Sequence, residues 1–275
     1  MKKRIMAIMA VMFVGCSIYY VSNAMATAGI KLAEETSLGE TDVKALAEKA
    51  RCGDGQACLR LADCYRKGIG VKKSLMGTVV MSLRASLYGA TKSGDEYFAS
   101  LPEDDEYRIC YNLLEKYGTS QEDCSSAIKR LEASEDPDVI ATCGVSLARL
   151  GDAEKGMALV EKAEKRGSTL AIMLKYADKD SLTDSDKSLL EEKAEALPSL
   201  YNLLGQAYLT ADKDGKTDYK KAASYYMKAE EQGMLDMIGA RWLLNCHEKG
   251  MDIQLTEEDV KRLKAFVSKS KASDD

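Results

Sequence analysis

Hydrophobic residues recur along the chain, from residue 38 onward, with the spacing of an amphipathic α-helix. Each apolar segment runs for about 12 to 15 residues and ends in a short group of Gly, Asp, Ser or Pro, which are common at helix ends and turns. No segment alternates convincingly between apolar and polar positions as a strand does. The pattern therefore predicts consecutive antiparallel pairs of helices. They are expected to begin near Thr41, Gly55, Ser74, Asp104, Ser120, Pro137, Asp152, Ser168, Thr183, Pro198, Thr217, Met234 and Thr256.

Proline usage and composition support the helical prediction. The chain has only three prolines, Pro102, Pro137 and Pro198, and each is expected at the start of a helix, where proline is tolerated. Ala, Leu, Lys, Glu and Met are plentiful, whereas Phe occurs three times and Trp once. The predicted fold class is all-α.

An internal repeat indicates how the helices are arranged. The segments Ala177–Lys187 and Ala211–Lys221 share Ala-Asp-Lys-Asp, Thr-Asp and a closing Lys, and they lie 34 residues apart. A helical hairpin of this period cannot bury its apolar face alone, so such units stack and share a core. We expect a solenoid of about six hairpins over residues 41–270, with a flexible linker over 27–40 and a disordered tail over 271–275.

Two segments resemble the Sel1-like repeat, a TPR-like family. Gly53–Ala90 has Leu, Ala and Tyr, then Gly-x-Gly-Val, then a second helix that ends in Ala and Gly, and Ser199–Gly233 is similar. The units between them fit loosely, and Gly94–Asp105 departs from the repeat as an irregular insertion. The resemblance implies a right-handed α-solenoid of stacked antiparallel hairpins that acts as an adaptor, with a protein or peptide held on its concave face. It also assigns Tyr65 and Tyr208 to packing between the two helices of a unit.

Residues 1–26 have the order of a secretory signal peptide. A basic start precedes an apolar run from Ile5 to Val21 and the small-x-small sequence Ala24-Met25-Ala26. The mature chain would then start near Thr27, in the periplasm or outside a bacterial cell. Membrane attachment is the alternative, through an uncleaved leader, since the apolar run is at the short end of a span, or through a lipid on Cys16, whose preceding residues resemble the bacterial lipobox.

Net charge narrows the range of partners. The chain carries 39 basic and 44 acidic residues, a net charge of −5. Removing the leader with Lys2, Lys3 and Arg4 makes the remainder more acidic. Phosphate binding requires a net basic face, so the charge argues against a nucleic-acid partner. An acidic rim would favour basic partners.

The motifs that suggest a ligand are incomplete. Gly215-Lys216-Thr217 ends like a P-loop but lacks the earlier glycine and a preceding strand. Asp212, Asp214 and Asp218 surround Gly215 without the order of an EF-hand loop. His247 is the only histidine, which rules out clusters of histidine ligands. We expect no cofactor and no metal.

Ser126 and Lys129 match the Ser-x-x-Lys of penicillin-binding enzymes, in which the lysine helps to activate the serine. The companion Ser-Asp-Asn and Lys-Thr-Gly motifs are absent, as is any mixed α/β pattern. We therefore expect no catalytic residue. Weak β-lactamase or penicillin-binding activity has been attributed to Cys-rich Sel1-like relatives and is kept as an alternative function.

Seven cysteines follow the leader, and disulfides are the default interpretation in an exported chain. Cys52 is expected in the turn before a helix, within reach of Cys58, and Cys-rich Sel1-like proteins bridge one unit to the next in this way. Cys110 and Cys124 are expected on opposite arms of one hairpin. The odd count leaves one thiol free, buried or paired with another chain, so a disulfide-linked structural envelope protein is a further alternative.

Aromatic residues supply the candidates for a binding surface. Core packing is the default for tyrosines at helical spacing, but aromatic side chains also concentrate binding energy at interfaces. On this basis Tyr226 and Trp242 are candidate surface residues. The predicted function is an exported scaffold that binds a protein or peptide partner through a concave solenoid surface, without catalysis.

Overall fold

The computed structural model describes residues 40–115, 121–177, 179, 181–210 and 217–271. All regular secondary structure in these residues is α-helical, which confirms the predicted fold class. The helices are α2 (Glu40–Arg51), α3 (Gly55–Lys67), α4 (Leu75–Leu87), α5 (Gly94–Ser100), α6 (Glu106–Glu115), α7 (Gln121–Leu131), α8 (Pro137–Arg149), α9 (Ala153–Lys165), α10 (Thr169–Ala177), α11 (Asp184–Ala194), α12 (Leu200–Leu209), α13 (Tyr219–Glu231), α14 (Met237–Glu248) and α15 (Glu257–Lys271). They extend one residue beyond the predicted solenoid at each end. The predicted leader, Cys16, nearly all of the linker and the last four residues of the tail lie outside the described residues.

Every predicted helix is present, and two details differ from the prediction. The insertion Gly94–Asp105 contains a helix, α5, which is too short to show a helical period but is held by Tyr97 and Phe98, both buried in the core. Only Pro137 stands in the first turn of a helix. Pro102 and Pro198 lie in the turns before α6 and α12, where a missing N–H is equally harmless.

The helices pair as antiparallel hairpins, and the most extensive pairs are α3 with α4, α8 with α9, and α12 with α13. In the first of these, Gly68 ends α3 in the left-handed conformation (φ 72°) and donates its N–H to the Cys64 carbonyl. Ser74 then caps α4 by accepting the Gly77 N–H at 3.0 Å. The Gly-x-Gly sequence therefore forms a hairpin turn, and Tyr65 packs directly against Gly77 as the Sel1-like resemblance implies.

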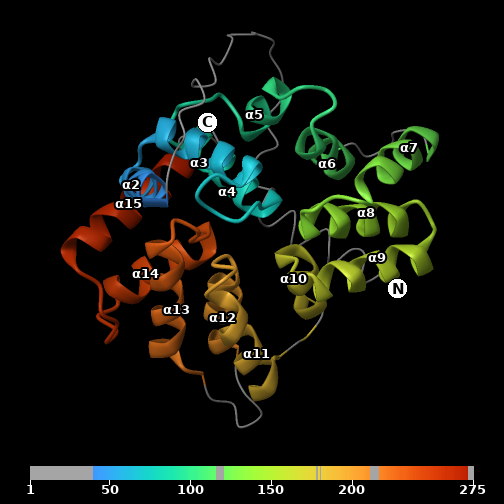
Figure 1. Cartoon of the computed structure of the whole chain (residues 1–275). Helices are drawn as coiled ribbons and strands as arrows, with labels where there is room; N and C mark the ends of the chain where they lie inside the picture. Colours follow the sequence, from blue (N-terminus) through green and yellow to red (C-terminus); the bar gives the residue numbers. More distant parts are fainter. Residues whose placement is uncertain (1–39, 116–120, 178, 180, 211–216, 272–275) are drawn as a thin grey trace.

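The two ends of the helical stack meet, an arrangement that the sequence did not indicate (Figure 1). Helix α15 packs on α4, and Tyr88, the C-cap residue of α4, lies 6.4 Å from Phe266 of α15 between ring centroids. Arg51 of α2 and Arg262 of α15 both donate to the buried Glu230 of α13, at 2.7 and 3.2 Å. Two contacts therefore hold the ends of the stack together: the ion pairs of Glu230 with Arg51 and Arg262, and the apolar contact between Tyr88 and Phe266. We call them the clamp.

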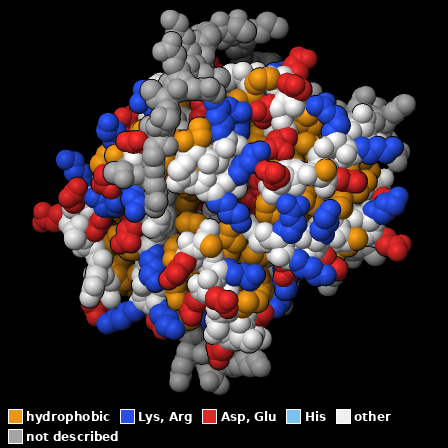
Figure 2. All heavy atoms as spheres, in the orientation of Figure 1, with side chains coloured by type: hydrophobic (Ala, Val, Ile, Leu, Met, Phe, Trp, Pro, Cys, Tyr) orange, Lys and Arg blue, Asp and Glu red, His pale blue; other side chains and the backbone are white. Residues whose placement is uncertain are grey.

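On the face that Figure 2 shows, positive and negative side chains are mixed, and neither sign of charge dominates. Lys and Arg side chains are interspersed with Asp and Glu there, with apolar side chains between them. In the described part of the chain, no helix is both long and apolar enough to cross a membrane.

Candidate functional site

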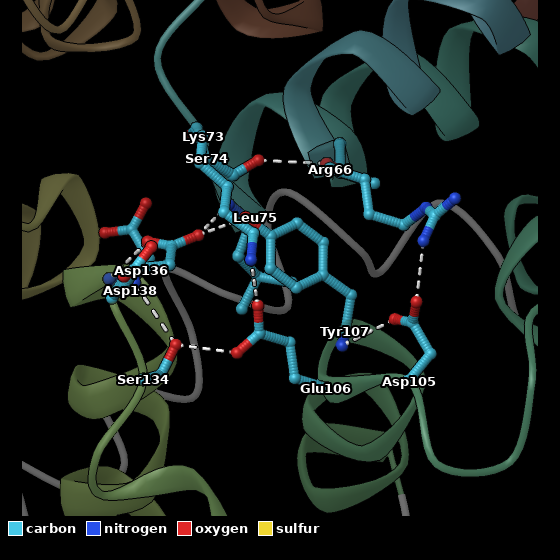
Figure 3. Close-up of polar contacts among 12 residues, drawn as sticks. Arg66, Lys73, Ser74, Leu75, Asp105, Glu106, Tyr107, Ser134, Asp136 and Asp138 are labelled. Atoms are coloured by element: carbon cyan, nitrogen blue, oxygen red, sulfur yellow. Dashed lines mark hydrogen bonds and ion pairs between the residues drawn. The ribbon is translucent and has the colours of Figure 1, made fainter. Parts of the chain in front are cut away.

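A buried polar junction joins four helices, α4, α6, α8 and α10, around Asp136 and Asp138 at the start of α8 (Figure 3). Asp136 caps α8 by accepting the Asp138 N–H at 2.8 Å through Oδ1. Its Oδ2 accepts the Leu75 N–H, at the start of α4, at 2.7 Å, and it also accepts the Tyr107 hydroxyl of α6. One carboxylate thus ties three helices together.

Asp138 makes the matching contact to α10. Its Oδ1 accepts the Ser168 hydroxyl at 2.7 Å and the Leu170 N–H at 3.0 Å. Burial raises the pKa of Asp138. Burial, followed by the charge of Asp138, raises the pKa of Asp136 to about 6, against the opposing effect of its hydrogen-bond donors.

Ion pairs flank the junction on the side of α6. Lys73 pairs with Glu106, which also accepts the Ser134 hydroxyl at 2.7 Å. Arg66 of α3 donates to Asp105 at 2.7 Å (Figure 3). Both central carboxylates, Asp136 and Asp138, are at most 2% exposed and their oxygens are occupied by donors, so no substrate can reach them. The junction is a structural contact, which raised pKa values alone do not turn into an acid–base site.

An open cleft of about 690 Å³ lies at the edge of the stack, where the ends of α11, α12 and α13 meet the connection between α14 and α15. Its apolar lining includes Tyr208, Tyr219, Met251 and Ile253. The other lining residues are Asp184, Lys187, Thr210, Thr217, Asp218, Lys220 and Asp252. Aromatic and apolar groups with a few polar ones are the usual lining of a binding pocket.

A row of stacked tyrosines supports the cleft from behind. The ring of Tyr225 lies 6.2 Å from Tyr201 and 5.5 Å from Tyr208, nearly parallel to both. Glu191 of α11 accepts the hydroxyls of Tyr225 and Tyr208 at 2.6 and 2.8 Å. These hydrogen bonds, the one from Tyr225 first, lower the pKa of Glu191. Tyr208 packs between α12 and α13 as the resemblance implies, and it also presents its ring to the cleft.

The two aromatic candidates from the sequence differ in their surroundings. The prediction of Tyr226 as a surface residue is wrong, because its ring is 1% exposed and fills the space left by Gly205 and Gly239. A Cβ atom at either glycine would lie 2.7 Å or less from that ring. Trp242 is half-buried against Tyr226, 5.6 Å between ring centroids, and lines neither this cleft nor a smaller cavity near α2. Its part in binding stays a prediction.

All seven described cysteines are thiols in this structure, so neither predicted bridge is formed here. Cys52 is exposed in the turn after α2, whereas Cys58 is buried in the core, where burial raises its thiol pKa to about 12. Cys110 and Cys124 lie on α6 and α7 as predicted and belong to one apolar cluster. Both pairings stay predictions for the oxidised protein, and Cys52 is the exposed thiol that could link two chains.

The serine candidates show no sign of a built active site. Ser126 and Lys129 are both exposed on α7, and neither lines the cleft or the smaller cavity. Within the described residues, no three His, Cys, Asp or Glu side chains gather as metal ligands would.

No protein-family model matches the chain, and no curated protein matches it. Among solved structures it is similar to a protective antigen of uropathogenic Escherichia coli strains that displays an SLR (Sel1-like repeat) fold, at 18% identity and a TM-score of 0.38. The match covers 85% of this chain and 56% of the antigen, so the chain spans about half of that protein's length. The fold named for the antigen is the one that Gly53–Ala90 and Ser199–Gly233 resemble.

Proposed function

We propose that this chain is an exported helical scaffold that binds a protein or peptide partner and catalyses no reaction. The observation that carries the proposal is the cleft at the edge of the stack, with Tyr219 at its border. Tyr219 is 46% exposed, and it lines the cleft together with the apolar Met251 and Ile253. Exposed aromatic residues next to an apolar pocket are typical anchors of protein interfaces.

The packing of the helices around the cleft supports binding. Its walls come from α11, α12, α13 and the segment after α14, which share one apolar core. A partner that meets a preformed cleft loses less free energy to ordering than one that must shape its site. Export is proposed from the order of basic, apolar and small residues over 1–26, with attachment through Cys16 as the alternative.

Affinity capture from the cell envelope tests this proposal. The tagged mature chain, after chemical crosslinking, is compared with Tyr219→Ser and with Met157→Ser, a matched variant on α9 that removes a side chain of similar exposure, 48%, far from the cleft in sequence. We expect a partner that is recovered by the wild type and Met157→Ser but is lost with Tyr219→Ser. Equal recovery of a partner by all three proteins would show that the cleft is not the binding site. Failure to recover any partner reproducibly would refute the proposed binding function.

Hydrolysis of nitrocefin tests the enzyme alternative. We expect no turnover, or turnover that is the same in wild type and Ser126→Ala, because Ser126 is exposed on α7 and lines neither the cleft nor the smaller cavity. Turnover that disappears with Ser126→Ala would overturn the non-catalytic proposal.

A further inference from the structure

Lys187 of α11 lies in the lining of the cleft in a state that is rare for lysine. The residue is only 8% exposed, and its Nζ sits 4.7 Å from the centroid of the Tyr208 ring. Its ammonium makes no hydrogen bond or ion pair with any described residue. Lysine is almost never buried unless it is paired. The ring attracts the charge, and no described residue accepts a hydrogen bond from the ammonium, which solvent in the cleft can reach.

Two carboxylates of α11 near Lys187 are hydrogen-bonded to other residues, and the third, Asp184, is exposed in the cleft lining without an ion pair to Lys187. Glu191, four residues further along the helix, accepts the hydroxyls of Tyr208 and Tyr225 through Oε1. Asp186 accepts the Lys179 ammonium at 2.8 Å and closes the capping box with Thr183. Glu191, one turn further along α11 than Lys187, is thus hydrogen-bonded to the stacked tyrosines and not paired with Lys187.

A second set of donors faces the same cleft at the start of α13. The cap residue Asp218 accepts the Lys221 N–H at 3.0 Å. The backbone N–H groups of Tyr219 and Lys220, both in the cleft lining, bond to no described residue. Free N–H groups in the first turn of a helix attract an anion through hydrogen bonds and the helix dipole.

The rim of the cleft has the opposite charge. Asp184 and Asp218 are exposed in the lining, and the Lys220 ammonium is paired with Asp252. A ligand that places a negative group on Lys187 therefore benefits from a positive group at the rim. A bare anion would meet the rim carboxylates without compensation.

We propose that the cleft binds an acidic side chain of a protein partner, with its carboxylate on the Lys187 ammonium and an adjoining basic residue against Asp184 and Asp218. This inference rests on the proposed function and names the chemistry of its partner. The ammonium of this largely buried lysine gives a carboxylate a charge-assisted hydrogen bond that salt screens less than one at the open surface. The Tyr208 ring and Ile253 would cover the aliphatic part of the acidic side chain.

Blocked amino acids test the carboxylate without knowledge of the partner. N-acetyl-glutamate N-methylamide and its glutamine analogue are titrated into the ¹⁵N-labelled chain, and the amide signals of Tyr219 and Lys220 are followed by NMR. We expect saturable shifts with the glutamate probe and at least about tenfold weaker binding of the glutamine probe. Lys187→Met should bind the glutamate probe as weakly as the glutamine probe, whereas Lys162→Met, which removes an exposed charge on α9, should bind like wild type.

Several outcomes would overturn the inference. They are equal binding of the two probes, no saturable shift with glutamate, unchanged glutamate binding by Lys187→Met, and tighter binding of inorganic phosphate than of the glutamate probe. The comparison of the two probes on wild type stands even if Lys187→Met does not fold. A captured partner that is lost with Tyr219→Ser but kept by Lys187→Met would leave the proposed function intact and refute the carboxylate contact alone.

Discussion

Replacement of Glu230 by alanine should open the contact between the two ends of the stack. The Glu230 side chain is 8% exposed, and its two oxygens accept Arg51 and Arg262, whose side chains are 15% and 16% exposed. Removing one partner of a buried ion pair leaves uncompensated charge and typically costs about 3 to 5 kcal/mol. Arg262 keeps Asp259, so the lower end, about 3 kcal/mol, is expected for Glu230→Ala.

Urea unfolding followed by circular dichroism measures this loss, and Glu231→Ala is the matched control. Glu231 is the exposed neighbour of Glu230 on α13, and its replacement should change the free energy of unfolding by less than about 0.5 kcal/mol. Hydrogen exchange should rise in α2 and α15, which meet at the clamp, and stay unchanged in α8 and α9. If the free energy of unfolding of Glu230→Ala lies within about 0.5 kcal/mol of the wild-type value, the apolar contact between Tyr88 and Phe266 is sufficient to hold the two ends together. That result would refute the role given to the ion pair.

Three further predictions concern the buried groups. Between about pH 4 and pH 6 the native state binds a proton on Asp136 that the unfolded state does not bind, so the free energy of unfolding should rise as the pH falls through this window. The urea midpoint should therefore be higher at pH 5 than at pH 7. This difference should shrink in Asp136→Asn. Gly205→Ala, which ordinarily favours a helix, should instead destabilise by about 1 to 3 kcal/mol because its Cβ meets the Tyr226 ring, and an unchanged melting temperature would contradict this packing. Iodoacetamide should label Cys52 of the reduced native chain rapidly and Cys58 only after unfolding, as mass spectrometry can show, because Cys58 is buried and its thiol pKa is raised to about 12.

The helices could be predicted because their signals are local. Thr183 and Asp186 form a capping box within four residues, and Gly68 takes the left-handed conformation that ends α3. Helix α5 was missed because seven residues show too little of a 3.6-residue period. Signals that span one turn or one helix are readable from a single sequence.

The contacts between distant segments could not be predicted in the same way. Glu230 lies 179 residues from Arg51, and no local pattern distinguishes it from the exposed Glu231 beside it. Asp136 has the sequence of an ordinary N-cap, and nothing in that sequence shows that its second oxygen accepts the Leu75 N–H of another hairpin. Such contacts depend on how the units stack.

The candidate site shows the same division between local and distant information. Tyr208 and Tyr226 both stand at helical spacing among apolar residues, so their pattern does not tell which one reaches solvent. Two glycines on neighbouring helices, Gly205 and Gly239, make room for Tyr226 in the core. Tyr208 packs on Tyr225 at the end of α12 instead and reaches the cleft.

The clamp between the ends bears on how the chain can bind a partner. In an open solenoid each unit contacts only its neighbours, so the concave face can widen by small changes at every interface. Here the first and last units also contact each other through Glu230, so any change in curvature must strain or break that buried ion pair. A cleft built from helix ends at the edge, such as the one that contains Lys187, needs no change in curvature to admit a side chain. For the proposed binding function, the closed stack therefore favours recognition of single protruding side chains at its edge over the wrapping of a long segment.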